Sequence, residues 1–211
     1  MKTYPVQLEV SGPIAMWARP DTGGAPTSYP APTWSAAKGL LESIAFLSSG
    51  EAWWHPVRVE ICRRRGEAGG QVRYQRYTFN YGGPLRKDLN IKSGTGMQVF
   101  ATVIADACYR IHAEVRGQYG SGGRNPRHHL QEMFTRRLRQ GRCFRTPALG
   151  WREFTCGYWG NFRDETEVDD RLEIEIPSML SAVWDRPHSG AYASRFRRNV
   201  RIERGVLTYA E

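Results

Sequence analysis

Two adjacent histidines, His128 and His129, closely follow Pro126 in a segment that is rich in arginine. An imidazole titrates near neutral pH, so it can take or give a proton in acid–base chemistry and can hold a phosphate when it is charged. If a helix starts here, its free backbone N–H groups and the positive end of its dipole also attract anions. The segment could therefore bind a phosphate beside a proton-transfer group. The alternative to a binding site is an ordinary solvent-exposed helix face, on which histidine and arginine are common.

A helix must position these groups. Asn125 is a favoured N-cap, Pro126 suits the first helical position, and Gly141 suits a helix end, so the three residues bound a predicted helix. Four apolar residues recur at helical spacing and form its expected core-facing stripe: Leu130, Met133, Phe134 and Leu138. Arg136 and Arg137 lie away from this stripe, at least in part. The pattern predicts a helix with a basic outer face.

The composition indicates a globular protein with a polyanionic partner. The chain has 211 residues, of which 40% are hydrophobic and 12% aromatic, and this excludes a disordered chain. Its formal net charge is +9, and its basic residues are mostly arginine, which favours bidentate phosphate contacts. Basic clusters at residues 63–65, 136–145 and 195–204 could follow one extended polyanion. We expect a nucleic acid as the partner, with an anionic membrane surface as the second choice.

Secretion, membrane insertion and zinc binding are not expected. No apolar segment typical of a signal peptide follows Met1-Lys2, and no apolar run approaches the length of a membrane span. The four cysteines are widely spaced and form no C-x-x-C pair: Cys62, Cys108, Cys143 and Cys156. We expect four reduced thiols in a cytoplasmic protein that has neither a membrane partner nor a metal or other cofactor.

Hydrophobic periodicity and turn residues predict a mixed α+β chain. The expected elements are a strand at 6–10 that ends at Ser11-Gly12-Pro13, a helix at 35–49 capped by Thr33 or Ser35 and stopped by Gly50, strands at 57–62, 71–81 and 99–115, the helix after Asn125, strands at 151–158 and 172–176, an acidic surface loop at 164–170, and a basic hairpin at 196–209.

The predicted strand at 71–81 interleaves charge with flat rings. Arg73, Tyr74 and Arg76 alternate along QVRYQRYTFNY. Aromatic rings stack on unpaired bases and arginines contact phosphates, so this pattern suits single-stranded RNA. The alternative is a half-buried strand whose aromatic residues simply pack, and the sequence favours neither.

The order strand, helix, strand, strand, helix, strand predicts a ferredoxin-like core of the RNA-recognition-motif type with β-rich additions. We expect residues 1–160 to form this domain and residues 161–211 to form a C-terminal β-rich extension packed on it. Sheets of this kind commonly serve as RNA platforms.

Motifs across most of the chain resemble a known family. In the first half they are Ala18-Arg19-Pro20 and Pro32-Thr33-Trp34-Ser35-Ala36-Ala37-Lys38-Gly39-Leu40-Leu41-Glu42. In the second half they are Asn125-Pro126, His129, Met133-Phe134, Arg136-Arg137, Gly141, Cys143-Phe144, Pro147, Leu149-Gly150 and Arg152-Glu153-Phe154. Together they resemble the fifth family of CRISPR-associated proteins, in particular its subtype I-C branch, the pre-crRNA endoribonucleases.

The resemblance implies an RNA-binding protein of antiviral defence. Members bind the 5′ handle of CRISPR RNA in a Cascade surveillance complex, beside the backbone and large subunits, and meet target DNA only through that complex. In this branch the protein also cuts the precursor RNA without a metal. A base takes the proton of a ribose 2′-OH, the 2′ oxygen attacks the neighbouring phosphate, and an acid protonates the departing 5′ oxygen.

The resemblance also implies site residues. His129 matches the family histidine, the expected base or acid, and His128 stands where the family has a lysine. The family tyrosine falls near Ala45 or Phe46, and Tyr109, Tyr119 or Tyr74 are possible substitutes in space. The residues expected to contact RNA, from charge and from resemblance, are Arg19, Lys38, Arg73, Tyr74, Arg76, Arg124, Arg127, Arg136, Arg137 and Arg152.

Three functions stay open at this point. The protein could be a processing endoribonuclease that remains on the handle, or a Cascade subunit that binds the handle without cutting. A DNA-binding regulator is a more remote alternative, because no helix-turn-helix with a recognition helix stands out in the sequence.

Overall fold

The computed structural model describes residues 3–81, 97–117, 125–183 and 193–209. The elements in this part of the chain are β1 (Pro5–Ala15), α1 (Trp34–Ile44), β2 (Ala52–Arg64), β3 (Tyr74–Tyr81), β4 (Met97–Gly117), α2 (Pro126–Arg139), β5 (Tyr158–Gly160), β6 (Thr166–Val168), β7 (Ile174–Ala182), β8 (Arg195–Glu203) and β9 (Val206–Thr208).

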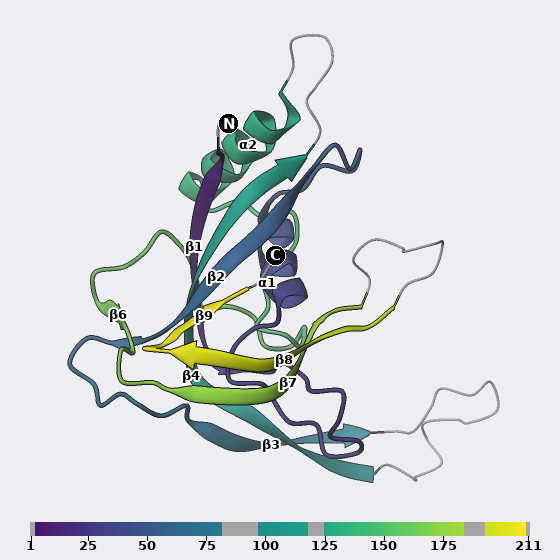
Figure 1. Ribbon diagram of the computed structural model, residues 1–211, viewed down its shortest axis with the longest axis vertical. Helices are drawn as coiled ribbons and strands as arrows, with labels where there is room; N and C mark the ends of the chain where they lie inside the picture. The colour runs from purple at the N-terminus through teal and green to yellow at the C-terminus, as the bar shows by residue number, and fades with distance from the viewer. Residues whose placement is uncertain (1–2, 82–96, 118–124, 184–192, 210–211) are drawn as a thin grey trace, which may run out of the picture.

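The strands join into one mostly antiparallel sheet. The main order is β5-β1-β4-β2-β9-β8-β7, with β3 paired to β4 and β6 paired to β2. Strands β1, β4 and β2 run side by side through the middle of the molecule (Figure 1). Since β9 pairs with β2 and β8 with β9, the last three strands continue this same sheet.

The two helices pack on one face of the sheet. Leu8 and Val10 of β1 and Ile111 of β4 are fully buried there, and the Phe134 ring of α2 packs 5.0 Å from the Trp54 ring of β2. Side chains alternate across a strand, so Glu9 of β1 belongs to the opposite face. We call this opposite face the open face, because it lies away from both helices.

Strand β4 is long, and its two parts pair with different strands. Its part from Ile104 to Glu114 pairs with β1, whereas residues Met97 to Ile104 pair with β3. The second pairing forms an arm that lies at the opposite end of the molecule from α2 (Figure 1). Asp106, near the junction of the two parts, has a φ of 51°, which is unusual for a residue other than glycine.

Several predicted boundaries in the first half were wrong, and the strand expected at 57–62 starts at Ala52. β1 does not end at Ser11-Gly12-Pro13 but continues to Ala15, because the ladder to β4 resumes after Pro13. The first helix ends at Ile44 and not near Gly50. Ala45 is extended, with φ −149° and ψ 137°, and its carbonyl accepts a hydrogen bond from the Trp54 indole at 2.7 Å. A tertiary contact therefore stops the helix earlier than its sequence suggests.

The region after α2 also differs from expectation. Residues 151–157 form turns instead of a strand, and the strand β5 starts only at Tyr158. The segment predicted as an acidic surface loop contains β6, and Asp169 at its end is buried. The carboxylates there bind basic partners of β2: Glu167 lies 2.6 Å from the guanidinium of Arg63. In contrast, the basic C-terminal hairpin is confirmed as β8 and β9.

Candidate nucleic-acid interface

The start of α2 is built by its cap. Asn125 is extended, and its side-chain oxygen accepts hydrogen bonds from the backbone N–H groups of Arg127 at 3.1 Å and His128 at 3.4 Å. The next N–H group, of His129, donates to the Asn125 carbonyl at 3.0 Å, and Pro126 has none. The expectation that free N–H groups bind a phosphate here was therefore wrong, because the cap and the first helical bond use them. A phosphate site at this helix start would therefore have to be formed by side chains.

The two histidines have different surroundings. The His128 ring meets the Tyr4 ring edge-on, with centroids 6.1 Å apart, and its Nε2 lies 3.5 Å from the Glu132 carboxylate. His129 is exposed. Because the helix begins at Pro126 as predicted, the two imidazoles leave it about 100° apart and do not aim at one atom. Both histidines are exposed and can meet a substrate from solvent, but the Glu132 carboxylate already contacts His128.

The arginines of α2 fall into three environments. Arg127 is only 7% exposed, and its guanidinium lies 5.3 Å from the Tyr4 ring centroid. Arg137 donates to the Ile44 carbonyl at 2.6 Å and so ties α2 to the end of α1. Arg136 is exposed. Of these three predicted RNA contacts, only Arg136 is exposed to solvent. Arg137 is half-buried and Arg127 is buried.

The arm presents rings and charge on its open face. Tyr74 and Phe100 are 46% and 48% exposed, and the Arg76 guanidinium lies 5.0 Å from the Phe100 ring centroid. On the other face of β3, the Tyr77 ring packs 5.0 Å from the Phe154 ring. The packing interpretation is thus confirmed on this second face, and the exposed face keeps RNA binding as a prediction. The sequence did not indicate Phe100, because nothing marks it as the partner of β3.

Two further predicted RNA contacts are already paired with carboxylates. Arg73 lies 3.5 Å from Glu67 and 3.3 Å from Asp106. Arg19 forms a two-pronged pair with Asp21, at 2.7 and 3.1 Å. A phosphate would have to compete with these carboxylates.

The remaining predicted contacts are scattered. The Lys38 ammonium lies 5.4 Å from the Trp34 ring centroid and 3.8 Å from Glu42, while Arg152 is exposed. Arg124 lies outside the described residues. The structure therefore does not gather the predicted residues into one site: those of α2 lie at one end of the molecule and those of the arm at the other (Figure 1).

Comparison with known proteins decides the family. A family model described as CRISPR-associated protein (Cas_Cas5), of the Cas5d type, matches residues 6–201. The chain belongs to the Cas5d family. Two Cas5d relatives, both named CRISPR pre-crRNA endoribonuclease Cas5d, are similar in sequence. That of Mannheimia succiniciproducens is 30% identical over 195 residues, covering 86% of this chain and 80% of the relative. That of Thermus thermophilus is 30% identical over 188 residues, covering 83% and 71%.

Solved structures share the Cas5d chain's fold. One, titled as a crystal structure of a CRISPR-associated protein, superposes with a TM-score of 0.67 at 16% identity and covers 100% of this chain and 95% of its own. Another, a functionally uncharacterized protein from Streptococcus mutans, also gives a TM-score of 0.67 at 16% identity, covering 98% and 92%. At this identity the likeness concerns the fold alone.

The position expected for the Cas5d tyrosine holds no phenol. Ala45 is buried, and Phe46 is 38% exposed with its ring centroid 4.8 Å from that of Phe144. Of the proposed substitutes, Tyr109 is buried in the core, where burial raises the pKa of its hydroxyl, and it donates to Pro30 at 3.2 Å. Tyr74 lies on the distant arm, and Tyr119 lies outside the described residues.

Sequence reasoning missed the tyrosine that does lie beside the histidines. Tyr4 packs against His128, and its hydroxyl accepts a hydrogen bond from the Asn125 side chain at 2.7 Å. The signal was weak, because Tyr4 precedes the first strand and is far from α2 in the sequence. It is buried, at 4% exposure, so it supports the first turn of α2 from beneath.

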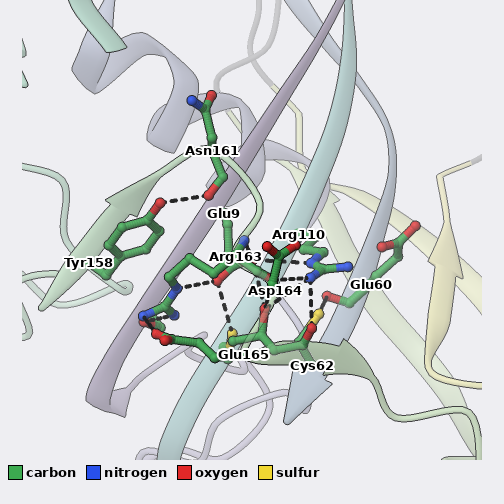
Figure 2. A network of polar contacts seen from close by, with 12 residues as sticks. Glu9, Glu60, Cys62, Arg110, Tyr158, Asn161, Arg163, Asp164 and Glu165 are labelled. Atoms are coloured by element: carbon green, nitrogen blue, oxygen red, sulfur yellow. Dashed lines mark hydrogen bonds and ion pairs between the residues drawn. The ribbon is translucent and has the colours of Figure 1, made fainter. Parts of the chain in front are cut away.

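A buried carboxylate organises the middle of the open face (Figure 2). Glu9 has no exposed surface, and its oxygens accept hydrogen bonds from Arg163 at 2.6 Å and from Arg110 at 3.1 Å. Burial alone would raise the pKa of Glu9, but the hydrogen bonds from Arg163, Thr166 and Arg110 outweigh it and lower the pKa. This network fastens the segment after β5 onto β1 and β4. It was not predicted, because its members are far apart in the sequence.

Neither helix in the described parts of the chain is long and apolar enough to cross a membrane. Those parts also contain no cluster of three or more His, Cys, Asp or Glu side chains that could hold a metal ion. The four cysteines are free thiols.

Proposed function

We propose that the protein binds the 5′ handle of CRISPR RNA and cleaves the precursor RNA by metal-independent attack of a ribose 2′-OH. The observation that carries this proposal is the 30% identity, over 86% of the chain, to a protein named CRISPR pre-crRNA endoribonuclease Cas5d. The exposed His129 on the arginine-bearing helix α2 supplies a group of the right chemistry.

In this proposal His129 transfers a proton and Arg136 binds a phosphate. The imidazole of His129 takes the 2′ proton or returns a proton to the departing 5′ oxygen. The exposed guanidinium of Arg136 lies on the same helix and neutralises phosphate charge. His128, which Glu132 holds at 3.5 Å, serves as a second proton carrier and not as the fixed cation that a lysine would be.

The arm binds unpaired nucleotides in the same proposal. Tyr74 and Phe100 offer exposed rings for base stacking, and Arg76, Arg73 and Arg19 supply nearby positive charge. A single strand of RNA is flexible and can reach from α2 to the arm, so the distance between them fits an extended ligand.

We propose a ferredoxin-like core for the domain at residues 1–160. The order β5-β1-β4-β2 is antiparallel throughout, with α1 between β1 and β2 in sequence and α2 between β4 and β5. This arrangement supports a core of the RNA-recognition-motif type, to which β3 is an inserted arm and residues 161–211 an extension.

We further propose that the protein works in the cytoplasm as a Cascade subunit. Its partners are then crRNA, the backbone and large subunits, and target DNA indirectly. A second candidate function is handle binding without cleavage. Phe46 at the expected tyrosine position and His128 at the lysine position favour this alternative, because neither supplies the family's chemistry.

The test is cleavage of the cognate repeat RNA by purified protein in EDTA. The wild type should cut the RNA, and His129→Ala should lower the rate at least about a hundred-fold, as expected for loss of a general acid or base. His55→Ala, a half-buried histidine of β2, is the matched control and should keep the wild-type rate.

Tight binding without product would instead establish the alternative, a handle-binding subunit. Cleavage that needs a divalent metal, or that survives in His129→Ala, would contradict the proposed chemistry.

A further inference from the structure

Four polar side chains form a row across the open face of the sheet. Gln7 of β1 lies directly opposite His112 of β4, which lies opposite Arg58 of β2, which lies opposite Thr208 of β9. Directly paired residues share a face, so the four side chains stand beside one another. Gln7, Arg58 and Thr208 can each donate hydrogen bonds to a ligand on this face. We call these four residues the polar row.

A nearly buried carboxylate orients the middle of the polar row. Glu60 is 9% exposed, and its Oε1 lies 2.8 Å from the His112 Nε2 and 3.1 Å from the Arg58 guanidinium. Burial tends to raise the pKa of Glu60, but the hydrogen bond from His112 and the nearby arginines lower it overall, so the carboxylate stays ionised. With Nε2 of His112 occupied by Glu60, its Nδ1 faces the Gln7 amide at 3.5 Å. That contact is long and easily replaced by a ligand.

Three of the four side chains of the polar row are open to solvent, whereas His112 is largely covered and packs edge-on against the Phe162 ring, with centroids 5.3 Å apart. The Arg58 side chain is 46% exposed and that of His112 is 16% exposed, and Gln7 is also exposed. The ladder between β2 and β4 shifts register between Pro56 and Arg58. Such irregularities re-aim a side chain and are frequent next to functional sites.

The polar row is also within reach of α2. Strand β5 pairs with β1 only at residues 9–11, so no strand among the described residues covers the outer edge of β1 before Glu9. At that edge the Gln131 amide of α2 donates to the Pro5 carbonyl at 2.8 Å. An RNA strand that leaves the first turn of α2 can therefore cross this edge onto Gln7 and His112.

A solvent-exposed sheet face would by itself explain why these residues are polar, but not why Arg58 and His112 are arranged around Glu60. Antiparallel sheets often expose one polar face. Such a face needs no buried ionised carboxylate within it, and the contacts of Glu60 with His112 and Arg58 have to offset the cost of burying its charge. Glu114, two residues along β4, is half-buried and would repel an anion at that side. It directs an anion toward Arg58.

We infer that the polar row is a phosphate-binding site for single-stranded RNA, with Arg58 as the main ligand, His112 as the residue that positions it, and Gln7 and Thr208 at the ends of the row. This inference rests on the proposed RNA binding and extends it to a surface that no sequence motif indicated. The phosphate accepts hydrogen bonds from the outward side of the Arg58 guanidinium and from the Gln7 amide, which turns from its long contact with His112. Arg58 and His112 are held by Glu60 before the ligand arrives, which lowers the entropy cost of binding.

The test is equilibrium binding of the cognate repeat RNA over a range of salt concentrations. Arg58→Ala should weaken binding about ten-fold, as for loss of one charge-assisted contact, and should reduce the slope of log affinity against log salt by about 0.7. His112→Gln should weaken binding less, and Arg58→Lys should restore the slope. Arg171→Ala, an exposed arginine outside the basic clusters, is the matched control and should change neither quantity.

Wild-type affinity and slope in both Arg58→Ala and His112→Gln would overturn the inference, as would an equal loss in Arg171→Ala. Thermal unfolding of each variant separates loss of the site from loss of the fold. If Arg136→Ala weakens binding while Arg58→Ala does not, the proposed function stands and this inference alone falls. If the wild type does not bind the RNA at all, both fall.

Discussion

Glu9 is a carboxylate with no exposed surface, and two arginines and a threonine hydroxyl surround it. Such a group stabilises the fold only while all its partners are present, because an unpaired buried charge is costly. Its hydrogen bonds hold the segment at 161–166 against β1 and β4 (Figure 2). Glu9 therefore belongs to the architecture of the open face and not to its chemistry.

The Glu9→Gln variant should lower the free energy of unfolding by about 3 kcal/mol at neutral pH, because Arg163 and Arg110 lose their counter-charge. Urea unfolding followed by tryptophan fluorescence measures this. The matched control is Glu165→Gln, an exposed carboxylate that also pairs with Arg163, at 3.3 Å, and it should cost less than about 1 kcal/mol. Equal losses in the two variants would contradict the account.

The contribution of Glu9 to the free energy of unfolding should also depend on pH. The pKa of Glu9 is lowered in the folded state, so its contribution is complete above the unfolded pKa of about 4.3 and is lost as pH falls through the lower folded value. The difference in unfolding free energy between wild type and Glu9→Gln should therefore shrink below about pH 4. A difference that stays constant or grows on acidification would show that charge is not the cause.

Residue types and spacing predicted the positions of the side chains on α2 but not their surroundings. Asn125, Pro126 and the apolar stripe placed His128 and His129 in the first turn, as observed. The burial of Arg127 and the bond from Arg137 to the end of α1 depend on contacts between elements. A single sequence does not show such contacts, since arginine in a helix reads as surface whether or not a partner lies above it.

At the scale of elements, the N-cap residue of α2, Asn125, forms hydrogen bonds both within the helix and to Tyr4. The Asn125 side chain binds two backbone N–H groups and also donates to the Tyr4 hydroxyl. Asn125→Ala should lower the unfolding free energy by about 1 to 2 kcal/mol, measured by urea unfolding. Asn161→Ala is the control, because Asn161 is an exposed loop residue whose backbone carbonyl accepts a hydrogen bond from Tyr158, and the substitution keeps that carbonyl. A loss below a few tenths of a kcal/mol in Asn125→Ala would show that the cap is dispensable.

The arm gives a second element-level prediction. If its open face stacks bases, Phe100→Ala should weaken binding of single-stranded repeat RNA by about 1 to 3 kcal/mol, or roughly five- to a hundred-fold. Phe196→Ala removes a ring of β8 that is 51% exposed and serves as the control. A fluorescence anisotropy titration compares them, and equal affinities for Phe100→Ala and wild type would exclude stacking at this ring.

Local patterns identified most elements, and their errors share a cause. The helix at 34–44 was extended too far because Gly50 reads as a helix end, whereas the indole of Trp54 binds the Ala45 carbonyl and ends the helix first. The acidic segment was predicted as a surface loop because carboxylates usually face water, whereas Glu167 pairs with Arg63 of a distant strand. In both places a long-range contact overrode the local signal.

At the scale of the whole molecule, positive charge and exposed rings occur at both ends of the sheet. α2 carries His129 and Arg136 at one end, the arm carries Tyr74, Arg76 and Phe100 at the other, and the polar row lies on the open face. With a net charge of +9, the molecule should attract any polyanion from a distance, so specificity must come from these local groups. The stacking rings favour unpaired RNA bases, which a DNA duplex does not expose.

The most direct test of the central claim is competition between two ligands for the wild-type protein at physiological salt. The labelled cognate repeat RNA is bound first, and unlabelled repeat RNA or duplex DNA of the same sequence is then added in increasing amounts. If the protein is an RNA-binding member of the Cas5d family, the RNA competes at least about a hundred-fold better than the duplex, within the usual range between specific and non-specific binding. Equal competition, or a preference for the DNA duplex, would contradict the account.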